Sequence, residues 1–428
     1  MRTASDAAVV LALKGGASAL QFLLLVLTAR WFGVAFRGEI ALFNASVNLI
    51  ALVVGFTGGA SIVYLTARDP SRAFLRRLLG ASYAFCVLVP LALGLGSSLV
   101  GQPLGREAPL VVSVAVVNSM LVVHICVLLS GSAVWQASLL EFLRPLCLVA
   151  LAAAIAVTRG FRTPGEFYVA WCVAATLAFL LSIPFVAGHY LRLTPASAGA
   201  AASSGEVVRH LLGFGFLAQA SNVVQFLNYR SLFFALERHA GIAAVGLFST
   251  AVALAEVLWI PANSLAAMTL NRVSRSSQDP ETRPFVLRMS RLALMAMLAV
   301  GALAAIVPVG WITALLGKDF AAVRSQLVGL LPGVIAIGMA VIASAYNAGL
   351  GLYSRNLLAA LAGLLLTGLG FVLLVPRLGS AGAIIAMNAS YVVTSAWLMV
   401  GLGLRERVRL REFVPNARDV SGSATGMP

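Results

Sequence analysis

Charged residues are what this 428-residue sequence has least of. They make up 11% of the chain, whereas soluble domains carry about 25%. Apolar residues reach 60%, which is far too many for a disordered chain. A membrane-spanning helix needs roughly 20 apolar residues, so the apolar content is sufficient for about twelve of them. This composition excludes soluble and disordered proteins and predicts an all-α, multi-pass membrane protein.

Cysteine and histidine are also scarce, with four of each in the sequence. The cysteines lie singly within apolar runs, which is typical of buried thiols and not of a disulfide framework. The histidines show no metal-ligand spacing, and the sequence contains no Gly-rich phosphate loop, His-Glu-x-x-His motif or nucleophile paired with a base. We therefore expect no metal, no cofactor and no enzymatic activity.

Basic residues are in excess, giving a net charge of +15, but they form no separate basic domain. Nearly all are arginines in short segments between apolar runs, which argues against a nucleic-acid-binding face. With the N-terminus inside, cytoplasmic segments carry about twice as many Lys and Arg as outer segments. The positive-inside rule then predicts that both termini are cytoplasmic.

Twelve apolar runs predict about twelve transmembrane helices. Several contain proline, which membrane helices tolerate because neighbouring groups satisfy the freed backbone atoms. The predicted helices are 8–29, 39–64, 78–99, 110–130, 138–158, 167–188, 212–235, 241–266, 292–315, 326–349, 357–375 and 380–403.

Short motifs recur between the two halves of the chain. Gln21-Phe22-Leu23 returns as Gln225-Phe226-Leu227, and Leu42-Phe43 returns as Leu247-Phe248 at nearly the same offset. That offset equals six helices, so it predicts two six-helix lobes related by an axis along the membrane normal. The predicted divisions are an N-terminal lobe (1–190), a cytoplasmic linker (191–211), a C-terminal lobe (212–404) and a basic cytoplasmic tail (405–428), of which 420–428 is expected to be disordered.

Polar side chains concentrate in four of the predicted helices, which hold equivalent places in the two halves. Since charge in the hydrocarbon core is costly, such side chains usually face a cavity or a partner. We predict a hydrated cavity between the halves, with a cationic and amide lining that suits an anionic, hydroxyl-rich ligand. The candidate lining residues are Lys14, Gln21, Asn44, Asn48, Gln219, Asn222, Arg230 and Glu256, with Ser18, Thr28, Glu237, Ser249 and Asn263 on the same helix faces.

Other roles remain open for several of these residues. The amides also suit interhelical packing, and Lys14 and Arg230 are near enough to helix ends to snorkel towards water. Glu141 and Arg144, one turn apart, are expected to pair with each other.

Glu256 is the most informative of the candidates. It lies about 15 Å from either interface, out of reach of water. We predict that it faces the cavity and binds a coupling ion, H⁺ or Na⁺. The alternative is a buried ion pair with an unidentified partner.

Two arginine-rich segments have a simpler explanation. One contains Arg68, Arg72, Arg76 and Arg77, and the other contains Arg405, Arg407, Arg409 and Arg411. We interpret both as topology determinants attracted to anionic membrane lipids, in preference to dedicated headgroup sites.

Several short motifs resemble polysaccharide-type (Wzx-like) flippases of the multidrug/oligosaccharidyl-lipid/polysaccharide exporter superfamily. The motifs are Leu13-Lys14-Gly15, Thr28-Ala29-Arg30, the Arg37-Gly38 turn, Leu42-Phe43, Leu143-Arg144-Pro145, Leu227-Asn228-Tyr229-Arg230, Val245-Gly246-Leu247-Phe248, Leu331-Pro332-Gly333 and Asn347-Ala348-Gly349. They extend over most of the chain.

The resemblance implies a transporter that moves an undecaprenyl-diphosphate-linked oligosaccharide from the inner to the outer leaflet of a bacterial inner membrane. It implies alternating access, ion-gradient coupling and headgroup binding by Lys14 and Arg230, with Arg30 and Arg37 as further contacts. A polymerase and glycosyltransferases of the same surface-polysaccharide pathway are the implied protein partners. The alternatives are a multidrug or cation exporter of the same superfamily, and a non-transporting scaffold of an envelope-assembly complex.

Overall fold

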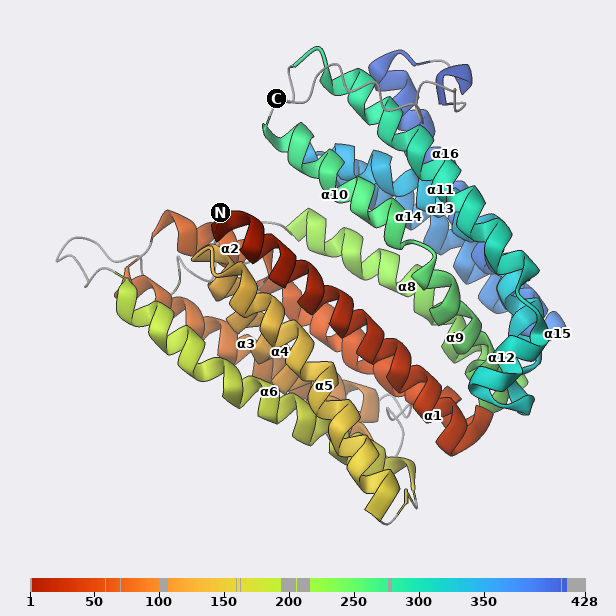
Figure 1. The fold of residues 1–428 in the computed structure, drawn as a ribbon, viewed down its shortest axis with the longest axis horizontal. Helices are drawn as coiled ribbons and strands as arrows, with labels where there is room; N and C mark the ends of the chain where they lie inside the picture. The colour runs from red at the N-terminus through yellow and green to blue at the C-terminus, as the bar shows by residue number, and fades with distance from the viewer. Residues whose placement is uncertain are drawn as a thin grey trace. The chain divides into compact units, whose positions relative to one another are not determined.

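The computed structural model describes residues 2–57, 59–69, 71–99, 107–158, 160–161, 163–193, 205, 216–275, 279–408 and 410–413. These residues are almost entirely helical, which confirms the prediction of an all-α membrane protein (Figure 1). The α-helices are α1 (Arg2–Val54), α2 (Ala60–Arg68), α3 (Arg72–Leu99), α4 (Ala108–Ser130), α5 (Val134–Thr158), α6 (Pro164–Arg192), α8 (Phe216–Ala240), α9 (Ile242–Val257), α10 (Ile260–Arg275), α11 (Thr282–Ile306), α12 (Val309–Leu316), α13 (Ala322–Gly349), α14 (Tyr353–Leu369), α15 (Val375–Leu378) and α16 (Ser380–Glu406). Short 3₁₀ turns lie at Gly55–Thr57, Lys318–Phe320 and Leu410–Phe413, and a π-helical turn joins α14 to α15 at Gly370–Leu374.

Among the described residues, nine helices are long and apolar enough to cross a membrane, or ten if the bent pair α9–α10 is one span. The chain is therefore a multi-pass membrane protein. The 47-residue segment Ala8–Val54 of α1 is counted once, although its backbone breaks at Gly33. The polar helix α8 is not counted. The described helices overlap all twelve predicted ranges, while the number of spans stays a prediction.

The break in α1 lies four residues before the predicted turn. Gly33 has φ 73° and ψ −171°, a conformation that is essentially restricted to glycine. The expected Arg37-Gly38 turn is instead helical, so the predicted start of the second helix at residue 39 was too late. The sequence offered several glycines in this region, and only the backbone shows which of them ends the first helix.

The chain divides into two compact units, which we describe separately. Unit 1 contains residues 1–31 and 42–219, and unit 2 contains residues 32–41 and 220–428. Unit 2 thus includes a short piece of α1 that the sequence placed with the first helices. The predicted linker 191–211 lies mostly, and the predicted tail beyond residue 413 entirely, outside the described residues.

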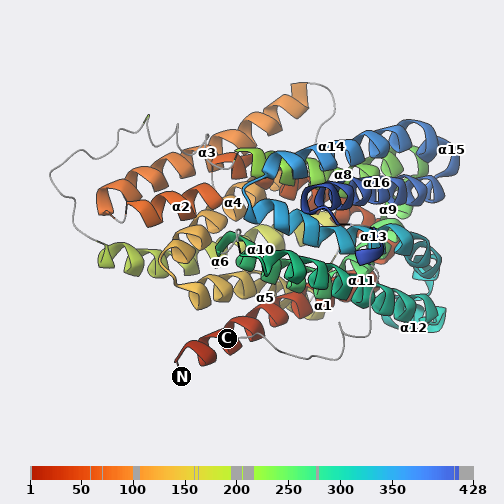
Figure 2. The ribbon, with the colours of Figure 1, turned by 90° about the horizontal axis from the view of Figure 1, so that it is seen from above.

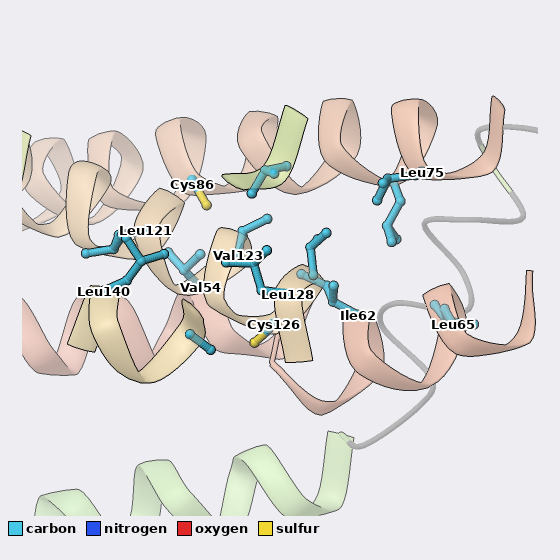
Figure 3. Packing of buried hydrophobic residues seen from close by; sticks show 14 of the residues in the cluster. Val54, Ile62, Leu65, Leu75, Cys86, Leu121, Val123, Cys126, Leu128 and Leu140 are labelled. Carbon is cyan, nitrogen blue, oxygen red and sulfur yellow. The ribbon is translucent and has the colours of Figure 1, made fainter. Parts of the chain in front are cut away.

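In unit 1, α4 packs against α2, α3, α5 and α6. A cluster of buried aliphatic side chains and two thiols joins these helices, including Leu75, Cys86, Leu121 and Leu140 (Figure 3). Cys86 and Cys126 are buried and free, as the sequence predicted for thiols inside apolar runs, whereas Cys147 and Cys172 are free but only partly buried.

In unit 2, α13 packs against α9, α10, α11 and α16 (Figure 2). Pro332 interrupts hydrogen bonding within α13, and Asn388 of α16 compensates for the interruption. The Asn388 side chain accepts a hydrogen bond from Gly333 N at 2.8 Å and donates one to the Gly329 carbonyl at 2.7 Å. A neighbouring helix thus satisfies the backbone groups near an internal proline, as the sequence led us to expect.

The predicted helix 241–266 is broken in the middle. Helices α9 and α10 meet at a 50° bend around Leu258 and Trp259. Pro261 explains the position of the break, because its ring clashes with the carbonyl four residues earlier, that of Val257, which is the last residue of α9. Ser249, Glu256 and Asn263 therefore do not form the continuous polar face that their heptad spacing predicted.

Candidate functional site

The candidate site in unit 2 depends on a close packing of α1 against α9. A Cβ on Gly38 would overlap the backbone carbonyl of Ile242, and one on Gly246 would overlap that of Val34. Small residues allow membrane helices to approach this closely. Arg37 lies in the same segment of α1, and its guanidinium is near that of Arg230 on α8.

Arg230 of α8 and Glu256 of α9 form a two-pronged ion pair. Arg230 Nη1 lies 2.7 Å from Glu256 Oε1, and Nη2 donates to Oε2 at 2.9 Å. Paired N–H···O bonds of this kind are the strongest that arginine makes with a carboxylate. The side chains retain 20% and 27% of their exposure, so the pair is only partly buried. Glu256 thus has a defined partner, and the alternative of an ion pair describes it better than an unpaired, cavity-facing carboxylate.

Arg37 adds a second cation to this pair. It is close enough to Arg230 for the two positive charges to repel each other. The Nε of Arg37 is buried and has no hydrogen-bond partner in the described part of the chain. Two guanidiniums and one carboxylate give the group a net charge of +1. A small anion is the ligand that would relieve both the repulsion and the unmet donor.

Aromatic side chains lie beside the Arg230–Glu256 ion pair. Tyr229, Trp259 and Tyr391 contact one another with ring centroids 5.3 to 5.9 Å apart. Trp259 Nε1 also donates to the Val334 carbonyl at 3.2 Å, which fixes the broken α9–α10 corner against α13. The Phe233 ring lies 5.3 Å from the Arg230 guanidinium, in the geometry of a cation–π contact.

Glu256 lies in the last turn of α9, directly before the break. Broken helices with irregular backbone are a recurrent feature of transporter binding sites near the bilayer midplane. The sequence indicated Glu256 by its distance from either interface and Pro261 by its residue type. It gave no sign that these two features meet at one corner.

The other predicted headgroup residues belong to unit 1. Lys14 is in unit 1, with its side chain 58% exposed and its Nζ 3.9 Å from Glu141 Oε2 on α5. Arg144 is also attracted to Glu141, so the pair expected within α5 becomes a three-residue cluster. Arg30 is exposed, also in unit 1. Within unit 2, the structure brings together Arg37, Arg230 and Glu256.

The predicted amides have different surroundings. Asn48 donates to the Asn44 side chain and backbone carbonyl, at 2.7 and 2.8 Å, so these two pair within α1. Gln219 donates to the Leu52 carbonyl at 2.6 Å, which is the packing role that the sequence left open. Gln21 and Asn222 are exposed. In the polar face predicted for the first helix, Thr28 is buried and bonds to its own helix.

Sequence analysis overlooked a buried polar network in unit 1. His124 of α4 is 2% exposed, and both of its ring nitrogens contact hydroxyls, those of Tyr83 and Ser182. Ser182 donates its own proton to the Phe179 carbonyl at 2.5 Å, so it accepts from His124 Nδ1–H and leaves Nε2 to accept from Tyr83. Each of the three side chains comes from a different helix, and so no local sequence pattern shows the network. Among the described residues, no three His, Cys, Asp or Glu side chains are grouped so as to hold a metal ion.

The fold resembles solved transporter structures over nearly its whole length. An inward-facing multidrug resistance MATE family transporter of the MOP superfamily is 17% identical, with a TM-score of 0.69, covering 92% of this chain and 94% of its own. The lipid II flippase MurJ in an inward closed conformation is 12% identical, with a TM-score of 0.70 and coverages of 94% and 88%. A MOP superfamily transporter from Pyrococcus furiosus, whose binding pocket is described as having reverse polarity, is 16% identical, with a TM-score of 0.58 and coverages of 93% and 95%. The sequence matches no protein-family model and no curated protein sequence. At these identities the likeness shows a shared fold, and the fold is that of membrane transporters.

Proposed function

We propose that this protein is a flippase that moves an undecaprenyl-diphosphate-linked oligosaccharide from the inner to the outer leaflet of the bacterial inner membrane. Alternating access of two six-helix lobes, twelve spans in all with cytoplasmic termini, would carry the sugar headgroup while the lipid tail stays in the bilayer. The observation that carries the proposal is the net cationic group formed by Arg37, Arg230 and Glu256 beside a broken helix.

A diphosphate fits this group because it can replace the carboxylate. Guanidinium binds phosphate oxygens through the same fork that now holds Glu256. A diphosphate between Arg230 and Arg37 would neutralise both cations and could accept the unmet Nε–H of Arg37. When the headgroup leaves, Glu256 can pair with Arg230 again. Arg230 therefore keeps a counter-ion while the empty site returns to the inner leaflet side.

Protonation of Glu256 is expected to assist headgroup binding. A proton on the carboxylate breaks the ion pair and frees Arg230, whereas Na⁺ would be repelled by the two guanidiniums. By reciprocity, the bound headgroup favours protonation of Glu256. A proton that travels outward with the headgroup would move against an inward proton gradient and could not drive transport. We therefore propose Glu256 as a binding switch; a driving H⁺ or Na⁺ would have to bind outside this group, while the headgroup is absent.

A multidrug or cation exporter is the second candidate. The aromatic cluster of Tyr229, Trp259 and Tyr391 next to a carboxylate could bind an organic cation. Against this, Glu256 is already neutralised by Arg230, and Arg37 leaves the group positive. An anion is favoured on charge alone.

The test is to delete the gene in its host bacterium and quantify polyprenyl-diphosphate-linked oligosaccharide in the membrane. We expect accumulation that wild type reverses and the Arg37→Gln/Arg230→Gln variant does not. Arg238→Gln, at the exposed end of the same helix α8, is the matched control and should complement fully.

Two outcomes would contradict the proposal. Loss of surface glycan without accumulation of the lipid-linked precursor would indicate a scaffold or an earlier step of synthesis. New drug sensitivity without accumulation would indicate the exporter.

A further inference from the structure

A second candidate site lies in unit 2, away from the Arg230–Glu256 pair. A cavity of about 370 Å³ opens where the start of α14 meets the end of α16. Its lining is apolar along Trp397, Leu398 and Leu404, with Arg355 and Arg405 as its cations. Its volume lies within the range of small-molecule pockets in proteins.

The two arginines differ in how they are held. Arg355, in the first turn of α14, forms no ion pair with any described residue. Arg405, in the last turn of α16, lies 3.8 Å from Glu406 Oε1 and contacts the Tyr346 hydroxyl, which itself bonds to Glu406. Helix α13 thus holds Arg405 at the rim through Tyr346. The cavity lining carries the two positive charges, and Glu406, the partner of Arg405, adds one negative charge next to it.

The arrangement of apolar and charged groups matches a lipid. Both arginines lie at the same end of the unit, in segments that the sequence predicts to be cytoplasmic. Trp397 lies eight residues before Arg405, about 12 Å along the helix, and half of its surface is exposed. Tryptophan at that depth is typical of the membrane interface, and the apolar lining continues towards the hydrocarbon. The apolar lining would contribute nothing to the binding of a free phosphate.

The net charge distinguishes between lipid headgroups. One surplus positive charge is neutralised by a phosphodiester, which carries a single negative charge, whereas a diphosphate would leave the site negative. We propose that this cavity binds an anionic phospholipid of the cytoplasmic leaflet, with its phosphodiester between Arg355 and Arg405 and an acyl chain along Trp397 and Leu404. The proposal gives Arg405 a defined lipid site, whereas the sequence interpretation was a topology determinant attracted to anionic lipids in general. This lipid would be a resident of the protein and not its transported cargo.

The test is native mass spectrometry of the purified full chain titrated with phosphatidylglycerol, phosphatidylcholine or undecaprenyl phosphate. We expect phosphatidylglycerol to bind most tightly. Arg355→Gln or Arg405→Gln should weaken its binding about fivefold, and the double variant about 30-fold. Arg377→Gln, an exposed arginine at the other end of the α14–α15 segment, is the matched control and should bind as wild type.

A filling variant tests the cavity without changing its charge. A Cβ on Gly401, which lines the cavity, meets nothing within 4 Å, so Gly401→Leu should occupy the space without a clash. We expect it to lose phosphatidylglycerol while keeping the wild-type unfolding temperature. Equal binding of the two phospholipids, or undiminished binding by both the double and filled variants, would overturn the proposal. Tighter binding of undecaprenyl phosphate than of phosphatidylglycerol would also overturn it and assign the cavity to prenyl lipids.

Discussion

Arg230 and Glu256 were assigned separate roles from the sequence, one binding a headgroup and the other an ion. In the structure they are each other's principal partner. One guanidinium cannot make paired hydrogen bonds to a carboxylate and to a diphosphate at the same time. Glu256 and the headgroup therefore compete for Arg230. The central question at the residue scale is therefore whether Glu256 controls access to Arg230.

Glu256→Gln should free Arg230 permanently. We expect a soluble undecaprenyl-diphosphate headgroup analogue to bind the variant more tightly than wild type, because the neutral amide competes less for Arg230. The gain should be about tenfold, the value of a charge-assisted hydrogen bond. Calorimetric titration of wild type and variant measures it.

The matched control is Glu237→Gln, an exposed acid near the end of α8 that has no place in the pair. It should bind the analogue with the wild-type affinity. Weaker binding by Glu256→Gln than by wild type would show that the carboxylate orients Arg230 for the ligand and does not compete with it.

The sequence predicted which residue types this site contains better than which residues lie together in it. Residue type and depth selected Arg230 and Glu256, whereas Arg37 was expected only from the resemblance to flippases. Within unit 2, the tertiary contact at Gly38 and Gly246 belongs to the segment that carries Arg37. A pair of glycines in apolar sequence does not show which helix each will meet. His124 was missed for the same reason, since its two partners are far away in sequence.

At the scale of the helices, glycine and proline determine where the site forms. Gly33 ends the first part of α1 and Pro261 ends α9, while Gly38 and Gly246 bring the following segment of α1 against α9. The approximate positions of the helices could be predicted because long apolar runs have few alternative structures in a bilayer. The breaks could not, because one glycine or proline among many is selected by packing.

Gly38→Leu or Gly246→Leu should separate α1 from α9. Either side chain would meet backbone atoms that cannot move aside, so we expect a cost of about 3 kcal/mol or more and a clearly lower unfolding temperature of the purified protein. Headgroup binding should fall as well, because Arg37 would be displaced from Arg230.

Gly15→Leu is the matched control within the same helix, since a Cβ there meets nothing within 4 Å. It should unfold at the wild-type temperature. An unchanged unfolding temperature in both the Gly38 and Gly246 variants would show that this helix contact is absent from the folded protein.

At the scale of the whole molecule, the fold is shared with transporters that handle different cargo. Structures of multidrug transporters and of a lipid II flippase resemble this chain to a similar degree. The fold therefore does not select the cargo, and the argument for a lipid-linked oligosaccharide depends on the charge of the site in unit 2. Three features of this group of residues favour an anion: its net positive charge, its two neighbouring guanidiniums, and the pairing of its one carboxylate with Arg230.

The most direct measurement is headgroup translocation in proteoliposomes that contain the purified protein and a polyprenyl-diphosphate-linked oligosaccharide. The fraction of glycan accessible to an added glycosidase reports movement between leaflets. We predict rapid exchange with wild type and with Arg238→Gln, and none above protein-free liposomes with Arg37→Gln/Arg230→Gln. Absence of glycan movement by wild type, together with transport of an organic cation by the same vesicles, would contradict the account and identify an exporter.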